Sequence, residues 1–235
     1  GSDGGPGRVK PPHWLLALSD APRALIDAGF LQVAAPLLHR LPPGNGQAVM
    51  VIPGFMGDDR GNMPLIRFLQ RLGYNASGWG QGRNLGPSRF SDEDLRTELS
   101  ALAGSSGGPV TLVGHSLGGI YAREIARVEP DNIRQVITLG SPFGPGRDTG
   151  SHASRMYKRL NPNADPRDDD NALATPPPVR TTAIYTKADG VVNWRTSVQE
   201  GNHGHVHNIE VLGSHIGLNL NAAVWYWVAK KLADA

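Results

Sequence analysis

The pentapeptide Gly114-His115-Ser116-Leu117-Gly118 places a hydroxyl group where it could act as a nucleophile. Its pattern is GxSxG, and it lies between the apolar run VTLV and a segment with helical periodicity. Between a buried strand and a helix, this pattern predicts a tight turn, the nucleophile elbow, that lifts the serine Oγ above a sheet. Glycines are needed because other side chains would collide with the strand and the helix. The alternative is a glycine-rich turn whose serine only caps the helix.

A serine hydroxyl is a weak nucleophile at neutral pH, so it needs a base and a group that orients the base. In a parallel sheet, functional side chains emerge at the carboxyl ends of strands. Two later predicted strands supply them, because TTAIYTKADG contains Asp189 and NIEVLGSH ends in His215. The order Ser116, Asp189, His215 is that of a catalytic triad on such a sheet. Taken singly, Asp189 fits an Asp-Gly turn, and His215 fits a capping or packed histidine.

Two backbone N–H groups are expected to bind the oxyanion that forms when such a serine attacks a carbonyl group. One is the N–H of Leu117, which lies at the N-terminus of the predicted helix. The other belongs to the loop after the first buried strand. There we choose the N–H of Phe55, because Gly54 before it lets the backbone approach a substrate.

The elements that must position these groups alternate between strands and helices. Buried strands are predicted at AVMVIPGF, VTLVGH and IRQVITLG, and further strands at 74–77, 180–190 and 208–215. Helices are predicted over 63–72, 91–103, 116–129 and 220–235, with Ser91 as an N-cap. This alternation predicts an α/β fold with a mostly parallel central sheet and helices on both of its faces.

The length of 235 residues suits one domain, which we place at 13–235. Residues 1–12 are rich in Gly and Pro and are predicted to be disordered. Residues 13–41 predict two helical segments divided near Gly29, which either pack on the domain or lie on a membrane surface. Residues 142–178 form a long connection between two strands, which predicts a small lid insertion. The alternative is a surface excursion that does not contact the substrate.

Several apolar, aromatic and histidine side chains are candidates for the substrate pocket because they lie near these groups in the sequence. Met56 lies beside Phe55 of the oxyanion loop, His115 beside the nucleophile and Ile216 beside the base. The insertion contributes Phe143, Met156, Tyr157 and Leu160. The last two candidates are Trp79 in a glycine-rich loop and Trp194 after Asp189. Aromatic side chains at such places belong to the core about as often as to a pocket.

The composition excludes other kinds of site. A net charge of +2 without a block of like charges argues against nucleic acid as a partner. The absence of cysteine excludes thiolate chemistry and zinc–sulfur sites. His203, His205 and His207 alternate as metal ligands might, but we interpret them as an exposed loop and expect no metal site.

No apolar run is long enough to span a membrane, although the segments in 13–41 allow peripheral membrane association. No signal-peptide core is visible, which slightly favours the cytoplasm, but Gly1-Ser2 resembles a cloning remnant, so a removed leader leaves the compartment open.

Together these residues give the chain a resemblance to the α/β-hydrolase family, and within it to bacterial lipases and carboxylesterases. The segments that carry it are VIPGF, GHSLGG, KADGVV and GSHIGL, and it spans about 49–235. The resemblance implies an eight-stranded, mostly parallel sheet, a serine-hydrolase mechanism without a cofactor, and a lid built from an insertion. One departure is that the oxyanion loop begins Pro-Gly where many relatives have His-Gly, which leaves the N–H of Phe55 unaffected.

The expected activity is hydrolysis of small neutral carboxylic esters, with short to medium acyl chains favoured, through an acyl-enzyme intermediate. One alternative is a lipase acting on longer-chain esters at lipid interfaces. An amidase, a thioesterase or an acyltransferase would use the same triad. A non-catalytic binding member of the fold is the alternative from a different class. The sequence leaves the natural substrate and the oligomeric state open.

Overall fold

The protein is described by a computed structural model that covers residues 9–147, 150–163, 170–201 and 204–235. Its centre is one sheet with the strand order β2-β1-β3-β4-β5-β6, and every neighbouring pair is parallel. The strands are β1 (Ala48–Ile52), β2 (Asn75–Gly78), β3 (Val110–His115), β4 (Ile133–Leu139), β5 (Arg180–Tyr185) and β6 (Val206–Glu210). The predicted α/β fold is therefore confirmed.

The expectation of eight strands is wrong for the described part of the chain, where the sheet has six. The described residues before β1 form a helix instead of further strands. The strands β1, β3 and β4 are almost wholly buried, as expected when helices cover both faces of a parallel sheet. Because all six strands run in the same direction, their carboxyl ends meet at one edge of the sheet.

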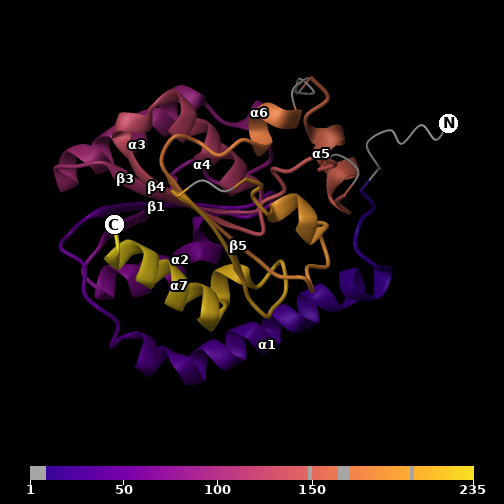
Figure 1. The fold of residues 1–235 in the computed structure, drawn as a ribbon, viewed down its shortest axis with the longest axis horizontal. Helices are drawn as coiled ribbons and strands as arrows, with labels where there is room; N and C mark the ends of the chain where they lie inside the picture. Colours follow the sequence, from indigo (N-terminus) through magenta and orange to yellow (C-terminus); the bar gives the residue numbers. More distant parts are fainter. Residues whose placement is uncertain (1–8, 148–149, 164–169, 202–203) are drawn as a thin grey trace.

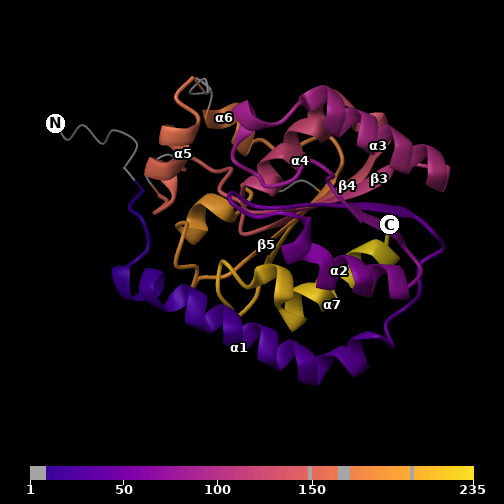
Figure 2. The same ribbon diagram turned by 180° about the vertical axis from the view of Figure 1, so that it is seen from behind.

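Helices cover both faces of the sheet (Figures 1 and 2). Helices α3 (Asp92–Ser106) and α4 (Leu117–Val128) lie on one face, and α2 (Asp59–Arg71) and α7 (Ala222–Ala233) lie on the other. Each face has its own apolar core. On the α2/α7 face, Phe68 and Trp225 stack with their ring centroids 4.6 Å apart. The predicted N-cap of α3 is confirmed, because the Ser91 Oγ accepts a hydrogen bond from the Asp94 N–H.

Helix α1 (Trp14–Leu38) is one continuous helix that lies outside the layer formed by α2 and α7 (Figures 1 and 2). The prediction of two helical segments divided near Gly29 is therefore wrong. A glycine inside a helix costs only about 1 kcal/mol, so tertiary contacts on either side of it can keep the helix continuous. Before Gly29, Arg23 donates a hydrogen bond to the Gly213 carbonyl, and after it Leu31 and Leu38 are buried in the core shared with α7.

The insertion at 142–178 contains two short helices, α5 (Ser154–Leu160) and α6 (Asp170–Ala174). Residues 148–149 and 164–169 of the insertion lie outside the described part. Residues 1–8 of the segment predicted to be disordered also lie outside it, but residues 9–12 are described and contact the domain. For example, the Asn193 side chain donates a hydrogen bond to the Lys10 carbonyl. Single turns of 3₁₀ helix lie at Pro87–Arg89 (η1), Pro130–Asn132 (η2), Trp194–Ser197 (η3) and Leu218–Leu220 (η4).

Replacing Leu112 by alanine is expected to lower the free energy of unfolding by about 2–5 kcal/mol, because this fully buried side chain of β3 would leave a cavity. Leu212→Ala is the matched control, since that side chain is 87% exposed and should change stability by less than about 0.5 kcal/mol. Denaturant unfolding followed by circular dichroism measures both values. Equal losses in the two variants would contradict the buried position of β3.

Candidate active site

Ser116 lies on a strained turn between β3 and α4. Its backbone has φ 51° and ψ −119°, a conformation that residues other than glycine rarely adopt. The turn is held because the Ser116 N–H donates to the Leu139 carbonyl of β4 at 2.8 Å. It also requires a glycine at position 118, since a Cβ there would collide with the carbonyl oxygens of Ile52 and Pro53. The GxSxG segment therefore forms the turn that its spacing predicts, with the hydroxyl at the carboxyl edge of the sheet.

The structure brings together the three side chains that the sequence singles out. His215 Nε2 lies 3.0 Å from Ser116 Oγ, and His215 Nδ1 lies 2.6 Å from Asp189 Oδ2. The other oxygen of Asp189 accepts hydrogen bonds from the N–H groups of Val191 and Val192 at 2.9 and 2.8 Å. Asp189 follows β5 and His215 follows β6, so both come from loops at the same edge of the sheet as the serine.

A second buried carboxylate, which the sequence analysis missed, joins these two loops. Asp20 of α1 is 1% exposed, and its oxygens accept hydrogen bonds from the backbone N–H groups of Gly190, His215 and Ile216, each at 2.9 Å. One helix side chain therefore holds the residue after the acid and the base itself. The only signal in the sequence is that Asp20 is one of three charged residues in a mainly apolar helical segment.

The surroundings of His215 favour its protonated form. Burial by itself disfavours the imidazolium, but the charge and hydrogen bond of Asp189, together with the charge of Asp20, outweigh it. The pKa of His215 is therefore raised above its ordinary value. His115 lies in the opposite situation, because burial and the nearby charge of His215 lower its pKa to about 4. Its Nε2 lies 2.8 Å from the His215 carbonyl, so a neutral ring with the proton on Nε2 donates to it.

The loop after β1 lies directly against the nucleophile. Ile52 and Gly114 are paired in the sheet, so the chain after β1 runs beside the turn after β3. A Cβ on Gly54 would lie 3.0 Å from the His115 carbonyl oxygen and 3.2 Å from the Ser116 Cβ, so a larger residue there would crowd the nucleophile turn. Asn84, which is fully buried, fixes this loop by donating to the Pro53 carbonyl at 2.8 Å and accepting from the Tyr121 hydroxyl.

A cavity of about 420 Å³ opens above Ser116. Its lining includes Ser116, Phe55 and Leu117 from the core of the domain, and Tyr157 from α5. The rings of Phe55 and Tyr157 meet edge to face, with their centroids 5.7 Å apart. The rest of the lining combines apolar side chains, such as Ile120 and Val192, with polar and charged ones, among them Glu124, Arg147 and Lys158. The insertion therefore borders the cavity.

The pocket prediction is wrong for two residues, Trp79 and Phe143, because both belong to the core. Trp79 is fully buried, and it packs against Phe90 and Tyr121 on the α3/α4 side of the sheet. Phe143 is also fully buried, and the guanidinium of Arg123 covers its ring at 3.9 Å. A glycine-rich loop or an insertion does not reveal from its sequence which of its aromatic residues face inward.

The other predicted pocket residues lie outside the lining of this cavity, with the exception of Tyr157. Trp194 stacks on Tyr185 at the end of β5, and His115 contacts the backbone of His215 instead of the cavity. The rest are exposed or only partly buried, namely Met56, Met156, Leu160 and Ile216.

Over the described residues, no group of His, Cys, Asp or Glu has the arrangement to hold a metal ion. His203 lies outside the described part, His205 lies in an exposed turn, and His207 belongs to β6. The predicted strand at 208–215 is thus shifted, because β6 begins at Val206 and His215 lies in the loop beyond it.

Comparison with known proteins fits this geometry. A family model described as the alpha/beta hydrolase family matches residues 52–212, which is more than half of the chain. The chain belongs to the alpha/beta hydrolase family. The match includes the nucleophile turn and the loop of Asp189, while His215 lies just beyond it. The resemblance inferred from GHSLGG and the accompanying segments is therefore confirmed for this hydrolase.

Solved structures of lipases and of a thioesterase share the fold of this alpha/beta hydrolase. A monoglyceride lipase from Saccharomyces cerevisiae is 12% identical with a TM-score of 0.60, covering 83% of this chain and 90% of its own. A monoacylglycerol lipase from Paleococcus ferrophilus is 16% identical with a TM-score of 0.53, covering 81% and 96%. The thioesterase domain from the curacin biosynthetic pathway is 16% identical with a TM-score of 0.52, covering 83% and 92%. At such identities the likeness shows the fold alone.

The two histidines of the site in this alpha/beta hydrolase should titrate on opposite sides of the ordinary value of 6.5. His215 is expected to lose its proton above pH 6.5 and His115 near pH 4, which NMR titration of the ring nitrogens measures. Asp189→Asn removes the main partner of the imidazolium, so the pKa of His215 should fall in that variant. A His215 pKa below 6.5 in the wild type would contradict the electrostatics of the site.

Proposed function

We propose that this protein hydrolyses carboxylic esters with Ser116 as nucleophile, His215 as general base and Asp189 as the group that orients the base. The observation that carries the proposal is the continuous chain of contacts from Asp189 through His215 to Ser116, at 2.6 and 3.0 Å, beneath a cavity. Membership of the alpha/beta hydrolase family supports hydrolysis as the class of reaction.

The reaction follows from these positions. His215 Nε2 takes the proton of Ser116 as the oxygen attacks the acyl carbon, and the Asp189 carboxylate stabilises the imidazolium. The N–H groups of Leu117 and Phe55 donate to the oxyanion. Leu117 is suited to this because the first N–H groups of a helix lack partners within the helix. His215 then protonates the leaving alcohol, and water attacks the acyl-enzyme with the same residue as base.

The cavity favours small, mainly apolar acyl groups. A volume of about 420 Å³ lies in the range of sites for small molecules, and Leu117, Ile120 and Val192 supply apolar lining near the serine. We therefore propose short to medium acyl chains as the preferred substrates. A lipase that accepts longer chains is the second candidate, favoured by the exposed apolar face of α1, since such a face suits work at a lipid surface.

The first test compares wild type and Ser116→Ala on p-nitrophenyl esters from acetate to palmitate. The variant should lose about 10⁶-fold in kcat, or fall to background, because no other group replaces the nucleophile. Falling rates beyond medium chains would separate the esterase from the lipase. Wild type that is inert on the whole series, or a variant that keeps its rate, would refute ester hydrolysis and direct the work to amides, thioesters and the non-catalytic alternative.

Asp20 is proposed as a positioning residue, and a pH profile tests this role. In Asp20→Asn an amide N–H₂ group replaces one carboxylate oxygen, so at least one backbone N–H group that donated to that oxygen loses its acceptor. The loop of His215 is then held less well, and kcat/KM should fall by about tenfold. The loss of its negative charge should also lower the pKa of His215, which moves the acidic limb of kcat/KM to lower pH.

The matched control for Asp20→Asn is Asp27→Asn. Asp27 also lies on α1, and it accepts hydrogen bonds from the backbone and hydroxyl of Ser214, next to the base. It should leave the acidic limb in place, because the charges that raise the pKa of His215 are those of Asp189 and Asp20. If the acidic limb of kcat/KM does not move in Asp20→Asn either, the role of Asp20 is purely structural.

A further inference from the structure

Helix α1 carries a long apolar face that no described segment covers. Trp14, Leu18, Leu25, Phe30 and Val33 are among its exposed side chains, and Leu25 and Val33 are 77% and 76% exposed. Gln32 is the one exposed residue of the helix with a polar side chain. At 1.5 Å per residue the helix is about 37 Å long, and Figures 1 and 2 show it as the outermost element on its side. We call this surface the outer face of α1.

The charged residues of α1 point toward the domain, whereas those of an ordinary surface helix point toward the solvent. All three of them, Asp20, Arg23 and Asp27, bind the loop 213–217 that carries the base. Leu31 and Leu38 on the same side are buried in the core. The helix is therefore fixed to the domain by its charged side chains and by these two leucines, while most of its other large apolar side chains turn outward.

A helix that is apolar on its outside as well as its inside is expected to be covered by something other than water. Two exposed side chains of the neighbouring loop, Leu212 and Ile216, add to the apolar surface beside α1. No helix of the described residues is long and apolar enough to cross a membrane. The hydrogen bonds of Asp20, Arg23 and Asp27 keep α1 against the domain. Whatever covers the outer face of α1 must therefore bind to it from outside the domain.

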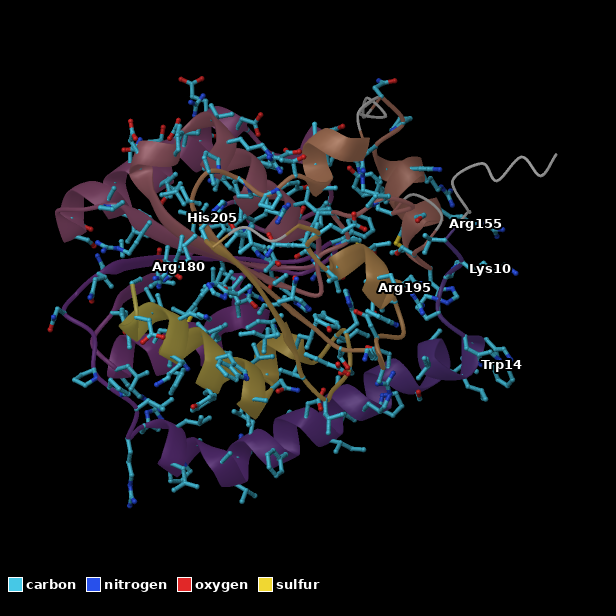
Figure 3. The ribbon with its side chains drawn as sticks, viewed as in Figure 1. Lys10, Trp14, Arg155, Arg180, Arg195 and His205 are labelled. Atoms are coloured by element: carbon cyan, nitrogen blue, oxygen red, sulfur yellow. The ribbon has the colours of Figure 1, made fainter. Side chains whose placement is uncertain are left out.

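Both ends of the outer face are basic. Lys10 and His13 precede the helix, His39 and Arg40 follow it, and all four are exposed. Figure 3 shows Lys10, Arg155 and Arg195 at the same end of the molecule as Trp14. Contacts confirm their closeness, since Asn193 binds the Lys10 carbonyl and His152 binds the Pro12 carbonyl.

These charges decide between two possible occupants. In a dimer through the outer face, a parallel pair would place Lys10 beside its copy, and an antiparallel pair would place Lys10 beside Arg40. Both arrangements bring positive ends together. A bilayer with anionic headgroups instead offers negative charge at both ends and an apolar layer between them. A tryptophan at one end is also typical of the boundary between headgroups and acyl chains.

We propose that the outer face of α1 binds the surface of a phospholipid bilayer that contains anionic lipids. The helix lies parallel to the surface, with Leu18, Leu25 and Val33 among the acyl chains and the basic ends at the phosphates. Binding needs neither the nucleophile nor a substrate, so it does not depend on the proposed ester hydrolysis.

Vesicle flotation with the full chain tests the proposal. Vesicles of phosphatidylcholine alone are compared with vesicles of phosphatidylcholine and phosphatidylglycerol in equal amounts. Wild type should float with the mixed vesicles, and less with the neutral ones. The double variant Leu25→Glu/Val33→Glu should lose binding at least about tenfold, because two charged groups would enter the apolar layer. Lys10→Gln/Arg40→Gln should reduce the preference for anionic vesicles.

Val128→Glu is the matched control, because Val128 is a comparably exposed valine, at 69%, on α4 across the sheet. It should bind vesicles like wild type, and far-ultraviolet circular dichroism shows that each variant folds. Wild type that does not float, or a Leu25→Glu/Val33→Glu variant that floats like wild type, would overturn the proposal. A dimer in light scattering that this variant dissociates would assign the outer face to a second copy of the chain instead.

Discussion

The carboxylate of Asp20 is the contact on which the arrangement of the site depends. Three backbone N–H groups, from Gly190, His215 and Ile216, converge on it, and the first two of these hydrogen bonds are buried. Buried N–H groups are costly to leave unpaired, so the two loops are stable in this geometry only while the helix is in place. The same negative charge supports the imidazolium of His215. The helix outside the sheet is thus part of the frame of the site.

Ser116 and its two partners were predictable because their signals are local. GxSxG after an apolar run indicates its own turn, and a parallel sheet brings the ends of β5 and β6 to the edge where that turn lies. The alternation of elements likewise predicts the fold. Asp20 has no such signal. Its partners are up to 196 positions away in the sequence, and nothing in an apolar helical segment tells which distant N–H groups one carboxylate will meet.

The pocket was hard to predict for a related reason. Trp79 and Phe143 lie in loops and Tyr157 lies in the short helix α5, and only Tyr157 borders the cavity. Whether such a side chain is enclosed in the core or borders the cavity depends on residues of other elements that pack against it. Tyr121 and Phe90 enclose Trp79, while the buried Arg123 covers Phe143. Arg123 also holds the end of the insertion, by donating to the carbonyl oxygens at residues 173–175.

The position of α1 also has a consequence for folding. The hydrogen bond from the His215 N–H to Asp20 closes a loop of 195 positions, whereas the sheet assembles from contacts between neighbouring strands. Contacts of such sequence separation carry a large entropic cost and tend to form late. An element on the outside of the domain is also among those that open locally at a free energy below that of global unfolding. We therefore expect the site to be completed late in folding and lost early in unfolding, before the sheet opens.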